Sequence, residues 1–248
     1  MPRKTDHEAR RKDILLNTIE LYLNTAMPVS SDALRRARKK DLSTASLRSV
    51  FSDLEEAGYL NHPHTSAGRV PTDDGYRYYI NALMKKTNLN SQEIEFINKI
   101  YEIKVQERED LFEETSSFMS DVTHYASVVY FLDQDEQKVY FKGFRYILEH
   151  PEFQDVQMAH MVFEVLERKE KLLDLITSNF SDKTRVYIGK ECACPQMEHC
   201  SVVVSRYGSS RQSDGRLALI GPKRMAYDKV IPFMDYVADV LTETLDHF

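Results

Sequence analysis

The segment 43–58 constrains the fold of this chain more than any other. Its large apolar residues recur at i, i+3, i+4 and i+7, which is the spacing of one helical face: Leu47, Val50, Phe51 and Leu54. The side chains on the opposite face are small apart from one arginine: Ala45, Arg48, Ser49 and Ser52. A helix with this pattern packs one face on its own domain and leaves the other face open to a second molecule. The segment therefore predicts a helix that serves both a core and a partner.

Capping and turn signals frame this helix. Ser43 is a preferred N-cap residue, and Gly58 is a preferred residue just after a last helical turn. A strand-like pair at 59–60, a turn-rich stretch and a return strand ending at Val70 predict a hairpin directly after the helix. Thr72 can then cap a further helix, so the hairpin is expected between two helices.

Two shorter helices are expected before this segment. Apolar residues at helical spacing predict the first over 13–24. Ser30 or Ser31 can cap the second, which ends in the basic run 35–40. Three short helices followed by a hairpin are typical of a winged helix-turn-helix, whose third helix enters the major groove of DNA.

The side chains of this unit suit contacts with DNA. Arg48 can reach a guanine edge or a phosphate, and the small residues beside it let the helix backbone approach the bases. Hydroxyl groups at a helix start suit phosphate oxygens, and Arg69 in the hairpin is a candidate for the backbone or the minor groove. The expected DNA-binding residues are Arg38, Lys39, Lys40, Ser43, Thr44, Ala45, Ser46, Arg48, Ser49, Ser52, His64 and Arg69. A basic amino-terminal arm is also expected to neutralise phosphates: Arg3, Lys4 and Arg10–Lys12.

The rest of the chain predicts a second, α+β domain. Helical patterns cover 91–124, as one helix or two, and then 155–177 and 227–245. Strand-like runs cover 126–132, 138–141, 185–188, 201–205 and 217–220. Strands mixed with flanking helices, without regular alternation, favour an α+β architecture. We expect a DNA-binding domain over 1–85, one or two linker helices over 86–125, and the second domain over 126–248.

Composition bounds the compartment and the partners. The net charge of −6 divides into +3 for residues 1–85 and −9 for the remainder, which favours different partners for the two halves. No apolar run is long enough to span a bilayer, and residues 1–12 lack the apolar core of a secretory signal. Three cysteines in 248 residues do not make a disulfide framework. A cytoplasmic protein without a membrane partner is expected.

No constellation in the sequence indicates an enzyme or a cofactor. There is no phosphate-binding glycine loop, no nucleophile elbow and no zinc-protease helix motif. Cys192, Cys194, His199 and Cys200 could hold zinc, but their spacing is not that of the usual finger patterns. Incidental cysteines in a loop are the favoured interpretation, and no cofactor is predicted.

Three stretches carry a family resemblance. The most specific is HTSAGRVPTDDGYRYY at 64–79, which lies within the longer similar stretch 42–79. The other two are FRYILEHPEF at 144–153 and IGPKRMAYDKVIPFMDYVADVL at 220–241. Together they resemble the HrcA family of heat-inducible transcription repressors. Because the stretches lie at both ends and in the middle, the resemblance covers most of the chain.

The resemblance implies a function and several partners. Such proteins repress chaperone operons by binding an inverted-repeat operator of double-stranded DNA, usually as homodimers. A GroEL-type chaperonin is thought to keep them in the binding-competent form. Their second domain is GAF-like and has no established small-molecule ligand. The resemblance therefore implies a repressor of heat-shock chaperone genes whose activity is modulated by the chaperonin.

The sequence departs from the family pattern in two ways. Ser49 stands where the family usually has asparagine, so the bidentate option for adenine is lost at that position. Family members are also usually longer between the strand ending at Leu132 and the motif starting at Phe144, where they carry an inserted dimerisation domain. This chain is expected to be a shortened member. The helices at 91–124 or 227–245 are the hypothetical dimer contact.

Two other functions stay open at this point. The GAF-like half could bind a small molecule and gate the DNA-binding half, which would require a pocket with convergent polar groups. Alternatively, the winged helix could bind another protein and no DNA. A steep fall of affinity with salt separates DNA binding from this last alternative, because it reports phosphate contacts.

Overall fold

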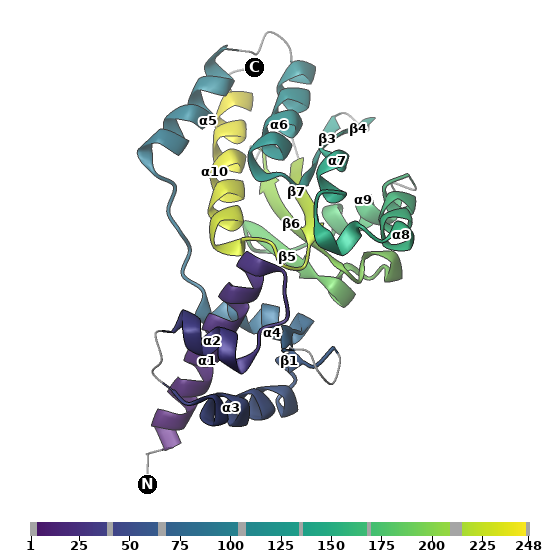
Figure 1. The fold of residues 1–248 in the computed structure, drawn as a ribbon. Helices are drawn as coiled ribbons and strands as arrows, with labels where there is room; N and C mark the ends of the chain where they lie inside the picture. Colours follow the sequence, from purple (N-terminus) through teal and green to yellow (C-terminus); the bar gives the residue numbers. More distant parts are fainter. Residues whose placement is uncertain are drawn as a thin grey trace. The chain divides into compact units, whose positions relative to one another are not determined.

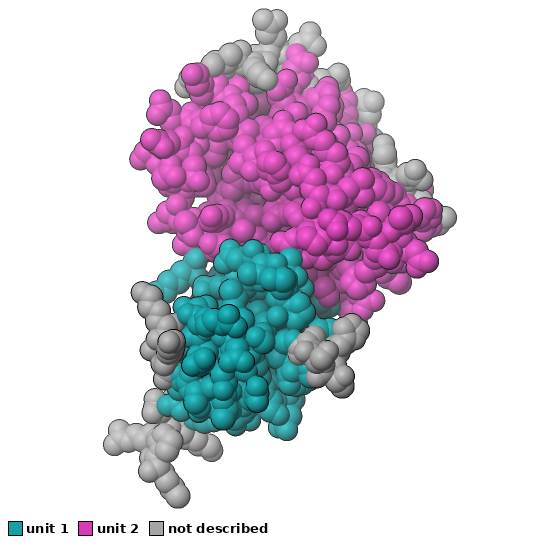
Figure 2. All heavy atoms as spheres, in the orientation of Figure 1, with its two compact units in different colours: residues 1–85 teal, residues 86–248 magenta. Residues whose placement is uncertain are grey.

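A computed structural model shows two compact units, residues 1–85 and 86–248 (Figures 1 and 2). The structure describes residues 4–38, 42–63, 68–103, 108–133, 136–167, 170–208 and 215–246. Among these residues, no helix combines the length and apolar character that a membrane span requires. The fold class is α+β, as the sequence predicts: helices and a hairpin form the first unit, and a five-stranded sheet with flanking helices forms the second.

The first unit is a winged helix-turn-helix. Its elements are α1 (Lys4–Thr25), α2 (Ser31–Ala37), α3 (Thr44–Glu56), β1 (Leu60–Asn61), β2 (Val70–Pro71), α4 (Asp73–Tyr78) and the π-helix η1 (Tyr79–Leu83). The hydroxyl oxygens of Ser30, Ser43 and Thr72 accept hydrogen bonds from backbone N–H groups in the first turns of α2, α3 and α4. These caps confirm the predicted helix starts. Ser30, rather than Ser31, is the cap of α2.

The hairpin is attached to the segment that precedes α2. Val29 and Arg69 exchange two backbone hydrogen bonds, with N···O distances of 2.8 and 2.9 Å. Gly68 permits this close approach, because a Cβ atom at that position would lie 2.3 Å from the carbonyl carbon of Val29. Gly58 has φ +79° directly after α3, a conformation that favours glycine. The hairpin is therefore anchored at both ends of the helix pair.

The basic residues expected in an amino-terminal arm lie on the first helix, and their contact with phosphates stays a prediction. The helix expected over 13–24 begins much earlier, so that Lys4 and Arg10–Lys12 lie on α1, and Arg3 lies outside the described residues. Leu15 and Ile19 of α1 are buried in the core of the unit. That apolar stripe anchors α1, and the charged residues before it continue the same helix.

The second unit contains one antiparallel sheet in the order β4-β3-β7-β6-β5. Its strands are β3 (Ala126–Asp133), β4 (Glu136–Lys142), β5 (Thr184–Ile188), β6 (Cys200–Tyr207) and β7 (Gly215–Pro222). Its helices are α5 (Ser91–Ile103), α6 (Arg108–Thr123), α7 (Phe144–Ile147), α8 (Val156–Glu167), α9 (Glu170–Thr177) and α10 (Tyr227–Leu245). Short 3-10 turns lie at Pro151–Phe153, Gly189–Cys192 and Pro195–Met197. The order places β3 beside the central strand β7, although the two strands come from opposite ends of the domain.

The sheet separates two layers of helices (Figure 1). α6 and α10 cover one face, where Ser116 of α6 meets Ser127 of β3 (Oγ···Oγ 2.9 Å) and Tyr227 of α10 meets Ser201 of β6 (2.7 Å). α7, α8 and α9 pack on the other face around the apolar side chains of alternate strand residues, such as Val128. The residues predicted at 91–124 and 155–177 form two helices each. α6 packs directly on β3 and β4 and so belongs to the sheet domain.

Candidate nucleic-acid interface

The rotation of α3 is fixed by its apolar stripe. The four stripe residues are nearly inaccessible to solvent, with exposed fractions of 1–5%: Leu47, Val50, Phe51 and Leu54. They pack α3 against α1 and α2. Because the helix cannot rotate without exposing this stripe, the opposite face is held outward.

That opposite face is a low polar strip, which we call the outer strip of α3: Ala45, Arg48, Ser49 and Ser52. All four residues are exposed. Ser43 and Ser46 are exposed at the start of the helix, and Thr44 is half-buried. Arg48 is the one long side chain on the strip, and its neighbours are an alanine and two serines. The strip can therefore approach a flat or grooved surface closely, with a single cation at its centre.

Arg48 leans across the helix pair. Its Nε donates to the hydroxyl of Ser31 at 3.4 Å, a long hydrogen bond. Ser31 is buried at the first position of α2, so this contact links the two helices of the motif. The terminal guanidinium nitrogens have no role in that bond, which leaves their donors for a base edge or a phosphate.

The start of α3 is partly occupied by its own cap. The Ser43 hydroxyl oxygen accepts from the Ser46 backbone N–H at 3.1 Å and lies 2.9 Å from the Ser46 hydroxyl. The two side chains therefore hold each other while remaining exposed. Their arrangement keeps the first turn rigid, which suits a helix start that must meet an anion.

Two of the predicted DNA-binding arginines form ion pairs within the unit. Arg38 Nη1 lies 2.6 Å from the Asp13 carboxylate, and Arg69 Nη2 lies 2.9 Å from the Glu55 carboxylate. Their side chains are only 15% and 20% exposed. Arg38 therefore ties α2 to α1, and Arg69 ties the hairpin to α3. Of the other expected residues, Lys39, Lys40 and His64 lie outside the described residues.

The basic residues of α1 are likewise engaged nearby. Arg11 donates to the backbone carbonyl of Asp53 at 3.1 Å, and Lys12 lies 3.1 Å from Glu8. The hydrogen bond with Glu8 and the negative charge of that residue raise the pKa of Lys12. The Arg11 bond braces α1 against α3, whereas the Lys12 pair lies within α1.

The cysteine motif is part of the core of the second unit. Cys192, Cys194 and Cys200 are all buried, with exposed fractions of 3%, 5% and 0%, whereas His199 is exposed. Burial raises the pKa of the Cys200 thiol. Within the residues that the structure describes, no group of three or more His, Cys, Asp or Glu side chains could hold a metal ion. The cysteines pack as small apolar side chains.

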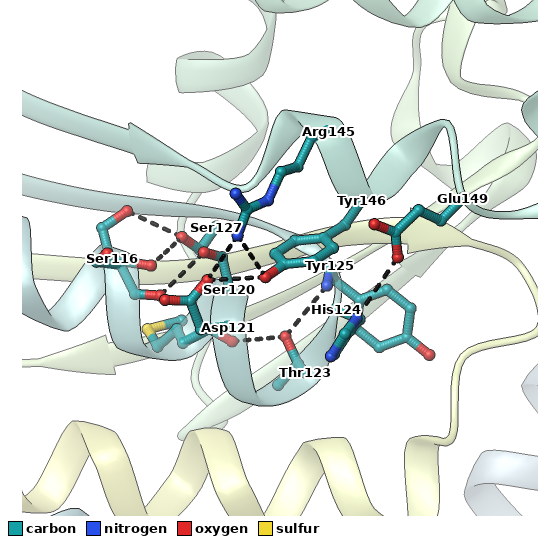
Figure 3. Close-up of polar contacts among 12 residues, drawn as sticks. Ser116, Ser120, Asp121, Thr123, His124, Tyr125, Ser127, Arg145, Tyr146 and Glu149 are labelled. Carbon is teal, nitrogen blue, oxygen red and sulfur yellow. Dashed lines mark hydrogen bonds and ion pairs between the residues drawn. The ribbon is translucent and has the colours of Figure 1, made fainter.

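A polar cluster that sequence reasoning missed lies at the junction of α6, β3 and α7 (Figure 3). Asp121 Oδ1 accepts from the Tyr146 hydroxyl at 2.8 Å and from Arg145 at 3.3 Å. Beside it, the His124 ring lies 3.5 Å from Glu149 and 4.6 Å from the Tyr146 ring, as measured between centroids. The cluster fastens the motif 144–153 to α6. The motif 144–153 was the sequence feature that could have indicated this cluster, but the motif does not show which residues of α6 it contacts.

Comparison with known proteins supports the architecture. A model of the HrcA protein C-terminal domain matches residues 77–231. A crystal structure described as that of a hypothetical protein has a TM-score of 0.75 at 16% identity, and covers 96% of this chain and 98% of its own. At that identity, the likeness shows the fold.

Curated relatives named heat-inducible transcription repressor HrcA match nearly the whole chain. The protein of Pelotomaculum thermopropionicum is 28% identical, covering 96% of this chain and 96% of the relative. The protein of Geobacter sulfurreducens is 28% identical, covering 98% and 99%. These alignments run over 335 and 339 residues, whereas this chain has 248, so the relatives carry a long stretch that this chain lacks. The relatives are regulators rather than enzymes. Because the family model matches more than half of this chain, the chain belongs to the HrcA family.

Proposed function

We propose that this protein represses heat-shock chaperone genes by binding an inverted-repeat operator, with α3 in the major groove. The observation that carries the proposal is the outer strip of α3, which presents Arg48 among small side chains on an exposed helix face. A recognition helix requires this combination, because its backbone must approach the base edges while one or two longer side chains read them. The names of the relatives support the heat-inducible repression.

The DNA contacts divide into two kinds in this proposal. Arg48 and Ser49 read base edges, while the start of α3 around Ser43 and Ser46 meets phosphates. Arg38 and Arg69 act mainly by holding α2 and the hairpin in place, since each is paired with a carboxylate. Lys39, Lys40 and His64 stay in the proposal as phosphate contacts.

The proposed assembly is a homodimer whose activity is modulated by a GroEL-type chaperonin in the cytoplasm. A two-fold protein matches the symmetry of an inverted repeat. This chain is shorter than its relatives. The proposed dimer contact therefore does not involve the inserted domain of the family. Sedimentation with and without operator duplex tests the dimer, and two chains per inverted repeat are expected.

Operator binding by the full chain and by Arg48→Ala tests the central claim. The duplex is the region upstream of the organism's chaperonin genes, and a scrambled duplex of equal composition is the reference. Loss of one base-reading arginine costs about 1–3 kcal/mol, so operator affinity should fall about fivefold to 150-fold while binding to the scrambled duplex changes little. Lys171→Ala, an exposed lysine on α9, is the matched control.

The result that opposes the proposal is equally concrete. If Arg48→Ala leaves the preference for the operator intact, α3 does not read the sequence. If the wild-type affinity is insensitive to salt, phosphate contacts are absent and the winged helix serves a different partner. Repeating the titration with chaperonin present tests the modulation, for which an increase in operator binding is expected.

A further inference from the structure

An apolar groove of about 250 Å³ lies in the second unit between α5, α6 and α10. Three aromatic rings step across it. The centroid of Phe118 lies 6.0 Å from that of Phe96 on α5 and 5.8 Å from that of Phe233 on α10. Phe118 and Phe233 are buried, whereas Phe96 is 55% and Val122 is 45% exposed beside the opening. The groove therefore has a firm aromatic floor and an accessible apolar rim.

The charged residues that line the groove are Glu93 and Lys229. The Glu93 carboxylate accepts the Asn90 backbone N–H at 2.7 Å, while the Asn90 side chain accepts the Glu93 backbone N–H at 2.9 Å. This reciprocal pair caps α5 and directs the Glu93 carboxylate, which keeps its negative charge, to the backbone N–H of Asn90. Lys229 is exposed in the first turn of α10. The groove thus offers apolar contact area and one cation at its rim.

The segment that joins the two units forms part of the groove wall. Leu89 lines the groove, and the residues just before it are fixed to α10. The Thr87 N–H donates to the Asp228 carbonyl at 2.9 Å, and Lys86 lies 3.3 Å from the Asp235 carboxylate. A molecule in the groove would therefore contact the joining segment, which is hydrogen-bonded to α10.

We propose that this groove binds a small apolar monocarboxylate, with its apolar part against the phenylalanine rings and its carboxylate at Lys229. The exposed ammonium of Lys229 favours an anionic group of the ligand at that point of the rim, and a carboxylate can form a charge-assisted hydrogen bond with it. The volume of about 250 Å³ is just below the roughly 300–1,000 Å³ of drug-sized ligand pockets, which favours a compact molecule over a peptide helix. Binding of such an acid would bear directly on Leu89 and the joining segment.

Calorimetric titration of the full chain with 3-phenylpropanoate and with its uncharged amide tests the proposal. We expect saturable binding of the acid and binding of the amide that is about fivefold to tenfold weaker, because a charge-assisted contact is lost. Lys229→Gln should lower the affinity for the acid to that for the amide. Lys171→Gln, on α9 across the sheet, should change neither value.

A second variant and a second measurement keep the test independent of folding and of DNA binding. Val122→Trp fills the groove from an exposed position and should abolish binding of the acid while the thermal unfolding transition stays cooperative. Hydrogen exchange at the Thr87 amide should slow when the acid is bound, since this amide is hydrogen-bonded to α10.

Three results would overturn the proposal. The first is no saturable binding of the acid to the wild type. The second is equal binding of acid and amide that Lys229→Gln leaves unchanged. The third is a wild-type dimer that binds no acid and that Val122→Trp dissociates, which would assign the groove to a second copy of the chain.

Discussion

The outer strip of α3 and the polar cluster around Asp121 are both rich in hydrogen-bonding groups and both contain exposed side chains, but they use these groups differently. In the cluster, Asp121 accepts from Arg145 and from Tyr146, and Arg145 donates to the same tyrosine at 2.8 Å. On the outer strip of α3, the side-chain hydrogen bond that the structure describes is the long one from Arg48 to Ser31. A polar surface whose members satisfy one another holds a fold together. A polar surface held outward by an apolar stripe keeps its donors for another molecule.

The largest effect is expected from a negative charge on the outer strip of α3, and the contrast with the Asp121 cluster fails if that charge does not change operator affinity. Ser49→Glu places a carboxylate among phosphates and should reduce operator affinity by about a hundredfold or more, because like charges then face each other across the interface. Fluorescence anisotropy of a labelled operator measures the loss. Ser181→Glu, at an exposed serine before β5, is the matched control and should have no effect. Equal losses from both variants would contradict the assignment of the strip.

The ion pair of the hairpin should have the next largest effect. Arg69→Ala leaves Glu55 without its partner and should lower the free energy of unfolding of the first unit by about 1–2 kcal/mol. Chemical denaturation followed by circular dichroism measures the change. Arg10→Ala, an exposed arginine on α1, is the control. Operator binding should weaken in proportion to the loosened hairpin, for operator and scrambled duplex alike. A selective loss on the operator would instead make Arg69 a base-reading residue.

The cluster around Asp121 should respond in stability alone. Tyr146→Phe removes the hydroxyl that donates to Asp121 and should cost about 0.5–1 kcal/mol, the value of one partly exposed hydrogen bond. Because these groups satisfy one another, operator affinity should stay within experimental error of the wild type. An operator-binding defect in a stably folded Tyr146→Phe protein would show that the cluster takes part in function.

The smallest expected effect is a pH dependence of stability near the same cluster. Burial lowers the pKa of His150 below its ordinary value of 6.5. The unfolded chain therefore binds the proton more readily than the folded chain, so the free energy of unfolding falls as the pH drops below about 6.5. His150→Gln should flatten this part of the curve of unfolding free energy against pH. Parallel curves for the two proteins would assign the dependence to other groups.

Local signals predicted much of this structure. Helix boundaries were predicted from Ser43, Thr72 and Gly58, because capping depends on residues within one turn of each other. The spacing of Leu47 and Leu54 fixes which face of α3 is buried, and the exposed strip follows from it. The strands of the sheet were found for the same reason, since their apolar runs lie between turn residues.

Contacts between distant segments were beyond this reasoning. The sequence marks Arg38 and Arg69 as cations but does not show that Asp13 and Glu55 come within ion-pair distance of them. The fold brings Asp121 and Arg145 together across a hairpin of two strands, and no local pattern encodes that meeting. The basic residues of the first unit were therefore predicted as DNA contacts, and only packing separates those that brace the unit from those that face outward.

The two hydrogen bonds between Val29 and Arg69 join the hairpin and the helix pair into one rigid frame. They attach the base of the hairpin to the residues just before α2. The backbones come so close at Gly68 that a side chain at this position would clash with Val29. The hairpin and the helix pair therefore cannot be re-aimed separately. In the proposed complex with DNA, a change of operator preference would therefore come from exchanging side chains on the outer strip of α3, because the hairpin and the helix pair keep one fixed arrangement.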